Sequence, residues 1–344
     1  MKLLLVASLL AQLLICKAVV KSTQFSGRII DCDDAEAHEA AVVAVNYINA
    51  NHNHGYKYVL NRIEKVKVRS QTPSEEIIFM ELDLLETKCP AVSPTPLKDC
   101  VLRPRREQVV EGDCDIKLHK EGGNFTVLGV RCKSEIESGE KCPTCPLLAP
   151  LNDTQVAHAV DLSLAKFNSG NNSVFYLLHE IGRAQIQDTP NFPNVFTTII
   201  TEFVIAATNC TLEDAQVDPS KCEVQADENA HYGGCDATVV KIQGKAGDEV
   251  TVQCTIYGPQ VPAQAPQAVT PSDPLGASQS KVDHRHFHHH LQHSGLPHFS
   301  SESSSAEAHH HSVHANHPVK RALTGNPVPP SPRIPLCPGK KIFY

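Results

Sequence analysis

The chain has 344 residues, enough for two domains of ordinary size and a remainder of roughly 85 residues that need not fold. Its net charge of -7 argues against nucleic acid as a partner, because a phosphate backbone selects basic surfaces. Thirteen cysteines indicate an oxidising compartment, since cytosolic proteins rarely keep structural disulfides.

The N-terminus has the pattern of a secretory signal peptide. Lys2 precedes an apolar run over residues 3–15 that is too short to span a bilayer, and Cys16 and Ala18 are small residues at the positions that a signal peptidase reads. We therefore expect residues 1–18 to be removed. Twelve cysteines then remain, and the product is predicted to be secreted, with no membrane span and no membrane partner.

After the signal peptide, residues 27–141 are predicted to form a domain with one helix and four strands. Asp33 and Asp34 can cap a helix that ends near Asn51. Polar and apolar residues then alternate over residues 56–69 and return over residues 77–87, which predicts a pair of antiparallel strands. Further strands are expected around Cys114 and over residues 125–132. The apolar face of the helix consists of Ala37, Ala41, Ala44, Val45 and Ile48.

Residues 142–257 repeat this order. Asp153 or Thr154 can cap a second helix, and residues 175–185 and 197–207 repeat the strand pair. The cysteines show the same duplication, since the four at 89, 100, 114 and 132 return at 210, 222, 235 and 254, offset by 121 or 122 residues. The sequence therefore predicts an α+β fold of two tandem cystatin-like domains, each with one helix on a four-stranded antiparallel sheet. Pairing within each set, such as Cys89 to Cys100 and Cys114 to Cys132, is compact, but spacing alone allows other pairings.

Between the copies lies Cys142-Pro143-Thr144-Cys145-Pro146. Two cysteines three apart could form half of a zinc site, a redox pair or a tight disulfide. In a secreted chain without a second such pair, the disulfide is favoured.

The remaining segment, residues 258–344, is predicted to be a largely disordered tail rich in proline, serine and histidine. Twelve of the nineteen histidines lie between His284 and His317. Such tracts can bind zinc loosely, and the alternative is a solvated linker without a stable site. The two triplets are His288, His289, His290 and His309, His310, His311.

Several positions are candidates for modification in the secretory pathway. Acceptor sequons begin at Asn124, Asn152, Asn171 and Asn209, of which Asn209 is the poorest because cysteine follows it. Serines in Ser-x-Glu contexts are candidates for phosphorylation, which would add negative charge and calcium-seeking oxygens. These serines are Ser138, Ser300 and Ser305.

Three segments resemble the fetuin family: the run of residues 85–100, the Cys-Pro-Thr-Cys-Pro linker, and the terminal Cys-Pro-Gly-Lys-Lys at residues 337–341. The likeness extends over residues 32–344. It implies a liver-derived plasma glycoprotein that binds calcium phosphate and restrains mineral growth. It also implies six disulfides, namely Cys32–Cys337, Cys89–Cys100, Cys114–Cys132, Cys142–Cys145, Cys210–Cys222 and Cys235–Cys254.

The sequence gives no sign of an enzyme. There is no nucleophile elbow or phosphate-binding glycine loop, and neither His38-Glu39 nor His179-Glu180 is followed by the second histidine of a zinc protease helix. The two hairpins with which cystatins block papain-like proteases are also missing, and the chain has no tryptophan.

Acidic residues instead predict a calcium phosphate surface on the first domain. Residues two apart on a strand share a face, and like charges this close normally repel one another unless a cation binds. Calcium takes carboxylate oxygens readily, and many weak contacts add up. For any single acid the alternative is a solvated strand face. The candidate residues are Glu81, Asp83 and Glu86 on one strand, and Glu111, Asp113 and Asp115 on another.

The second domain provides an internal comparison. Adding 121 to these positions gives acids only at Glu202 and Asp236, and the other four become Val204, Ala207, Tyr232 and Gly234. The fold therefore does not require these carboxylates. We expect the first domain to inhibit mineral growth, with calcium as ligand rather than cofactor and with a monomeric chain.

The alternative function is inhibition of astacin-type or venom metalloproteases by the linker. The linker resembles the element that some fetuin relatives use against astacins. Thr144 stands where that group carries aspartate, and a neutral hydroxyl is a poorer ligand for the protease zinc.

Overall fold

The computed structural model describes residues 27–28, 30–72, 74–137, 145–170, 173–188, 196–225, 231–242, 246–258, 286–291, 294–295 and 337–343. The expected signal peptide over residues 1–18 lies outside these ranges. Within them, no helix combines the length and the apolar character that a membrane crossing requires.

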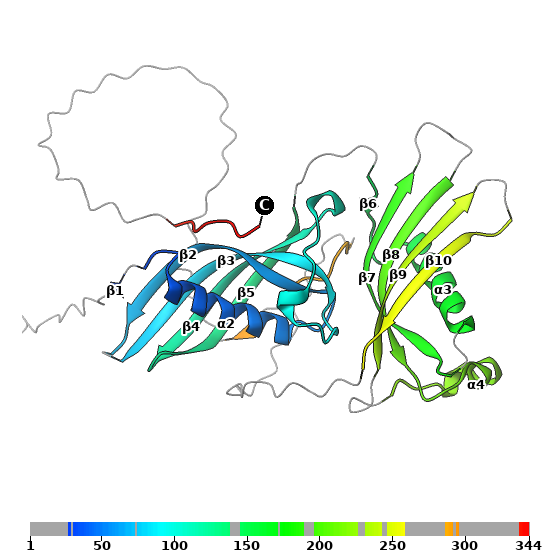
Figure 1. Ribbon diagram of the computed structural model, residues 1–344, viewed down its shortest axis with the longest axis horizontal. Helices are drawn as coiled ribbons and strands as arrows, with labels where there is room; N and C mark the ends of the chain where they lie inside the picture. Colours follow the sequence, from blue (N-terminus) through cyan, green and yellow to red (C-terminus); the bar gives the residue numbers. More distant parts are fainter. Residues whose placement is uncertain are drawn as a thin grey trace, which may run out of the picture.

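The first domain is an antiparallel sheet crossed by one long helix (Figure 1). Helix α2 (Ala35–Asn51) packs on the long strands β2 (Tyr56–Ser70), β3 (Glu75–Pro90), β4 (Val110–Glu121) and β5 (Asn124–Ile136). Two-residue strands, β1 (Gly27–Arg28) and β11 (Ser294–Gly295), extend the edges, and short 3-10 turns η1 (Leu97–Asp99) and η2 (Arg105–Glu107) lie between β3 and β4. The predicted α+β fold is confirmed, with two short edge strands in addition.

The second domain has the same plan. Helix α3 (Thr154–Ser169) packs on strands β7 (Tyr176–Asp188), β8 (Phe196–Ala207), β9 (Tyr232–Ile242) and β10 (Glu249–Ile256), with the short strand β6 (Leu147–Leu148) at the edge. A short helix, α4 (Leu212–Val217), and a 3-10 turn, η3 (Pro219–Lys221), fill the loop between β8 and β9. Sequence analysis did not predict α4, whose Thr211–Asp214 capping box identifies its start.

Both long helices begin at an aspartate cap. The Asp34 side chain accepts a hydrogen bond from the Glu36 amide at 2.8 Å, and Asp153 does the same for Gln155 at 2.7 Å. These bonds satisfy amides that a helix start leaves unpaired. Asp33 has another partner, because its carboxylate accepts from the Lys340 amide at 2.9 Å.

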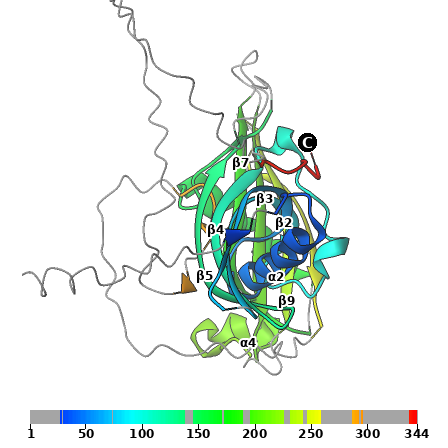
Figure 2. The same ribbon diagram turned by 90° about the vertical axis from the view of Figure 1, so that its left-hand side faces the viewer.

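Small residues bring α2 close to its sheet. Alanines at three-to-four-residue spacing are fully buried against the inner face of the sheet, as the helical periodicity predicts. Figure 2 looks along the molecule and shows α2 lying across one face of the sheet. The opposite face is not covered by this helix. The core of the first domain includes Ala37, Ala40, Ala41, Ala44, Ile78, Met80, Leu82 and Leu84.

Five disulfides are described: Cys32–Cys337, Cys89–Cys100, Cys114–Cys132, Cys210–Cys222 and Cys235–Cys254. These are five of the six pairs that the family resemblance implies. Cys145 is also disulfide-bonded, and Cys142 lies outside the described residues. Backbone bonds from Gly339 to Ile63 (2.9 Å) and from Ile342 to Asn61 (2.8 Å) support the Cys32–Cys337 link by holding the C-terminal segment along β2.

The domains meet through a buried cluster of charges. The Arg103 side chain is 0% exposed and binds Glu86 of the first domain and Glu202 of the second. Arg183 of the second domain reaches back to Glu86 at 3.2 Å. Because each domain supplies charges that the other neutralises, the two are coupled.

A short piece of the tail also packs at this junction. Leu291 is 3% exposed and joins the core of the first domain, while its amide donates to Ser134 Oγ at 3.1 Å. His286 contacts the second domain, since its carbonyl accepts from the Leu151 amide at 2.7 Å. The predicted tail therefore includes one segment, residues 286–291, that is anchored to both domains.

Candidate functional site

The candidate site is the face of the first sheet that α2 does not cover. Strand residues alternate between faces, and β3 and β4 are paired without interruption from Glu75–Glu121 to Leu85–Glu111. The odd-numbered residues of both strands therefore lie on the outer face. We call six acids toward one end of this outer face, including one on β5, the acidic face: Glu81, Asp83, Glu111, Asp113, Asp115 and Glu135.

The first row of this face places Glu81 opposite Asp115. A base lies beyond each acid. Lys65 on β2 is 3.5 Å from Glu81, and Arg131 on β5 is 2.5 Å from Asp115. The row thus reads base, acid, acid, base across four strands.

The second row has the same order. Asp83 lies opposite Asp113, with Arg62 beyond Asp83 and Lys133 beyond Asp113. Asp83 is only 3% exposed, and its Oδ2 accepts from Asn61 Nδ2 at 2.7 Å, whereas Asp113 is exposed. Within this row, Asp113 is therefore the acid that solvent ions can reach.

The third row pairs Glu111 with Glu135 and has Leu85 on the other side. Loss of hydration and the neighbouring carboxyl of Asp83 raise the pKa of Glu111 to about 7. Loss of hydration and Asp83 also raise the pKa of Asp113. Near neutral pH, Glu111 is therefore partly protonated, and a bound cation would displace its proton.

Glu86 does not belong to this face, and its assignment as a mineral-binding residue is corrected. It is 3% exposed, and its Oε2 lies 2.9 Å from Arg103 Nε and 3.2 Å from Arg183 Nη1. Burial is the main reason that its pKa is raised, and the two arginines oppose that shift. Sequence reasoning placed Glu86 with Glu81 and Asp83 because these acids are close in the chain, but Glu86 has the opposite strand parity.

Sequence reasoning also missed the bases and Glu135. Arg131, Lys133 and Glu135 alternate along β5, so the same rule that identified the other acids could have placed them on one face. Their pairing with β4 could not be known, because it depends on the register of the hairpin.

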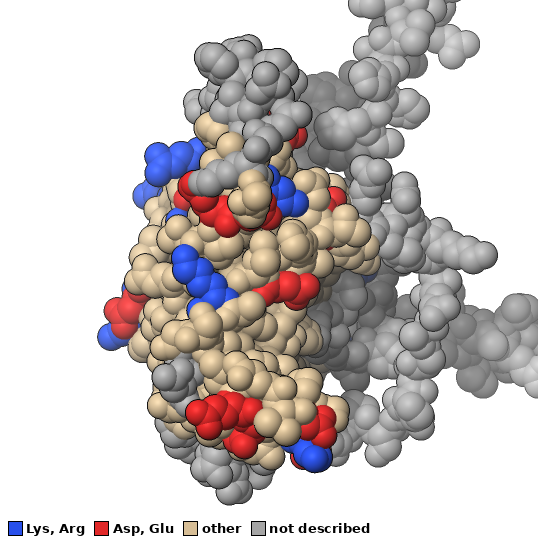
Figure 3. Space-filling model, turned by 90° about the vertical axis from the view of Figure 1, so that its right-hand side faces the viewer, with Lys and Arg blue, Asp and Glu red and all other residues tan. Residues whose placement is uncertain are grey.

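Among the described residues of the second domain, no equivalent face is present. The one acid–acid pair in their strand register is Glu202 opposite Asp236, and Glu202 is bound by Arg103. At the next row, Val204 lies opposite Gly234. Figure 3 views the molecule from the side of the second domain and shows small groups of acids, several with a base beside them, on a mostly uncharged surface.

Two of the described histidines of the tail make hydrogen bonds to carbonyl groups. His288 Nε2 lies 3.3 Å from the Ser134 carbonyl, and His289 Nε2 lies 2.9 Å from the Ile181 carbonyl. Burial lowers the pKa of His288 to about 4, so its ring is neutral at physiological pH. The second triplet, residues 309–311, lies outside the described part of the chain, and loose zinc binding by the tract stays a prediction.

The modification sites are only partly described. Asn124 begins β5 and is exposed, and Asn152 is exposed just before α3. Asn171 and the three candidate serines lie outside the described residues. The side chain of Asn209 accepts from the Glu223 amide at 3.0 Å.

Comparison with known proteins identifies the family. The cystatin domain model matches residues 27–123 and 145–244. Alpha-2-HS-glycoprotein of Rattus norvegicus is 38% identical over 100% of this chain and 99% of its own length. The human protein of the same name is 40% identical over 80% of this chain and 78% of its own. The chain belongs to the fetuin family.

Solved structures of fetuins agree with this assignment. Mouse fetuin-B matches with a TM-score of 0.54 and 26% identity, covering 69% of this chain and 73% of that one. Mouse fetuin-B in complex with crayfish astacin matches with a TM-score of 0.55, at 23% identity over 76% of this chain and 79% of the other. The second match supports the fold.

Proposed function

We propose that this fetuin is a secreted plasma glycoprotein that binds calcium phosphate through the acidic face and restrains mineral growth. The observation that carries the proposal is that acids lie directly opposite acids in three successive rows of the sheet. Such pairs destabilise a sheet unless a cation binds between them. Calcium coordinates carboxylate oxygens from several directions, so one ion can bind two opposed acids. The role is binding rather than catalysis.

The flanking bases strengthen this proposal, because the mineral contains anions as well as cations. The side chains of Arg131 and Lys133 are 54% and 73% exposed, so a phosphate from solution can reach them. Calcium would bind the central acids while phosphate contacts the outer bases. A face with both charges in ordered rows therefore suits a calcium phosphate cluster better than it suits free calcium.

The test is a precipitation assay with the full chain and a variant that neutralises the accessible acids. The variant carries E81Q, E111Q, D113N and D115N. Asp83 is kept, because Asn61 binds it in the interior. We expect the variant to lose inhibition of calcium phosphate precipitation, since three rows lose their calcium ligands.

The matched control removes the same number of acids from the second domain with D161N, E213Q, E223Q and E249Q. These four residues are exposed and lie far along the chain from the acidic face. The control should inhibit like the parent chain. Equal inhibition by the two variants and the parent would refute the acidic face as the binding surface.

Family membership and the disulfides both support secretion. Five described disulfides suit an oxidising compartment. Release of the chain into the medium of secretory cells, with residues 1–18 absent and glycans on Asn124 and Asn152, is the expected observation.

A second candidate function is inhibition of metalloproteases. Mouse fetuin-B has been solved in complex with crayfish astacin and with human meprin beta. In this chain, the segment after the linker is held in place, because Leu148 N donates to Gln108 Oε1 at 2.6 Å and Pro146 O accepts from Gln185 Nε2 at 3.4 Å. Assays against astacin and meprin beta test this function, and Thr144→Asp should strengthen it. If neither the parent chain nor the Thr144→Asp variant inhibits either protease, this function is excluded.

A further inference from the structure

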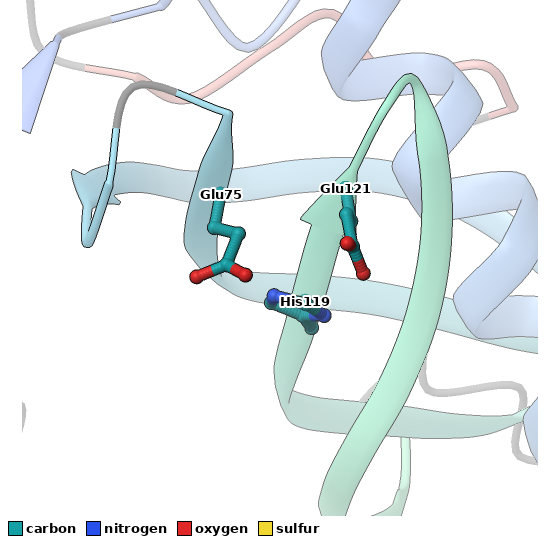
Figure 4. Close-up of side chains that lie close together, drawn as sticks. All are labelled: Glu75, His119 and Glu121. Atoms are coloured by element: carbon teal, nitrogen blue, oxygen red, sulfur yellow. The ribbon is translucent and has the colours of Figure 1, made fainter.

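A second group of ligand-type side chains lies at the other end of the same sheet face. Glu75 begins β3 and lies directly opposite Glu121 at the end of β4, while His119 precedes Glu121 by two residues. All three have the outer-face parity of the two strands. One nitrogen or oxygen from each lies within 4.8 Å of the others (Figure 4).

The two carboxylates of this group lack the basic neighbours that the acidic face has. Among the described residues, neither Glu75 nor Glu121 forms an ion pair with a lysine or arginine. The nearby bases Arg28 and Lys120 bind Glu76 on the inner face and Glu36 of α2 instead. Glu75 and Glu121 are therefore opposed like charges, an arrangement that costs stability unless a cation lies between them.

The chemistry of the ligands selects the kind of cation. Calcium takes six to eight oxygen ligands, and this group offers two carboxylates and an imidazole. Zinc is bound by imidazole nitrogen and carboxylate oxygen at about 2.0–2.2 Å, and three protein ligands leave a fourth position for water. Tetrahedral ligands of one zinc lie about 3.3 Å apart, which the flexible glutamate side chains can reach from the observed spacing.

We propose that Glu75, His119 and Glu121 form a zinc site that joins the ends of β3 and β4. The site is separate from the acidic face. His119 is the member of the site nearest to the acidic face, and it is four strand residues, about 13 Å, from Asp115. Zinc binding and mineral binding can therefore be removed independently.

A single tryptophan can report on this site, because the chain has none of its own. Phe79 is on the outer face, two residues beyond Ile77, which lies opposite His119. A tryptophan at position 79 would be about 7–8 Å from His119 in the pairing geometry of a sheet. We would titrate the full-length F79W chain with Co²⁺, whose binding at the site should quench the fluorescence, and then add zinc to displace it.

The expected result is saturable quenching that zinc reverses and calcium does not. Adding H119Q should lower the apparent Co²⁺ affinity about tenfold or more, since even residues that only support a metal ligand contribute that much. H158Q, which removes an exposed histidine of α3, is the matched control and should leave the affinity unchanged. Quenching that is equally strong with H119Q, or that zinc fails to reverse, would overturn the proposal.

A count of bound zinc keeps the test independent of the reporter. By equilibrium dialysis of the full chain without F79W, E75Q/E121Q should bind one zinc fewer than H158Q. Equal counts would mean that only other histidines bind zinc and would overturn the proposal. D113N/D115N should keep the zinc site, which separates this result from failure of the proposed mineral binding.

Discussion

Arg103 is expected to be the most sensitive residue of the domain junction. Its guanidinium is fully buried and lies 4.7 Å from the centre of the Tyr56 ring. Nη1 and Nη2 each bind a Glu202 oxygen at 2.8 Å, and Nε lies 2.9 Å from Glu86 Oε2. Although burial opposes it, Arg103 lowers the pKa of Glu202, so the pair is charged in the folded protein.

We predict that R103M lowers the free energy of unfolding by about 3 kcal/mol, near the lower end of the cost of breaking a buried ion pair. Methionine keeps much of the apolar stem but carries no charge. Glu86 keeps Arg183 at 3.2 Å and Glu107 keeps Lys88 at 2.8 Å, so the acid that loses its ion pair is Glu202. Its side chain is 19% exposed, and water can reduce part of the cost.

The measurement is urea unfolding of the full chain, followed by far-UV circular dichroism. The loss of unfolding free energy in R103M/E202Q should be smaller than the sum of the losses in R103M and E202Q by about 1 kcal/mol or more, because the two residues interact directly. R105M is the matched control. Arg105 binds Glu137 at 2.8 Å but is 42% exposed, so its loss should cost at most about 1 kcal/mol. Equal destabilisation by R103M and R105M would refute the reasoning.

Two further predictions concern the same junction. His52 is 4% exposed, and burial together with His289 and His54 lowers its pKa to about 4. The unfolded chain then binds the proton more readily, so stability should fall by up to about 3 kcal/mol as pH falls from 6.5 to 4. In H52L, the difference between the urea midpoints at pH 7 and pH 4.5 should be smaller than in the parent chain. An equal difference would contradict the lowered pKa of His52 as its cause. At Gly112, an added Cβ would lie 2.6 Å from Leu291 Cδ1. G112A should therefore expel Leu291, at a cost of about 1.5–3 kcal/mol, and hydrogen exchange of residues 286–291 should be faster. Exchange of residues 286–291 at the same rate in G112A as in the parent chain would contradict this prediction.

The sequence could predict the parts of this molecule that depend on local periodicity. Alternation placed Glu81, Asp113 and Asp115 on one face, and that face is observed, because strand parity is fixed by the backbone. The helix caps and the cystatin order followed from short-range signals in the same way. These features require no knowledge of distant residues.

The errors arose where distant residues decide the environment. Glu86 is buried by Arg103 and by Arg183, which is 97 residues away in the chain. Asp83 is shielded by Asn61 from the neighbouring strand. Strand parity could have separated Glu86 from Glu81, but Asp83 has the same parity as Glu81. Only the packing of the strands could show that Asp83 is buried and Glu81 is accessible.

The disulfide between Cys32 and Cys337 joins two residues that are 305 positions apart, so it closes residues 32–337 of the chain into a covalent ring. One cut anywhere inside the ring opens the backbone without releasing a fragment. The dibasic pair Lys320-Arg321, a candidate processing site, lies inside the ring. The two pieces would migrate together until a reductant is added. The anchored segment at residues 286–291 would also keep its attachment to both domains, so such a cut would change the ends of the molecule and leave its two domains in place.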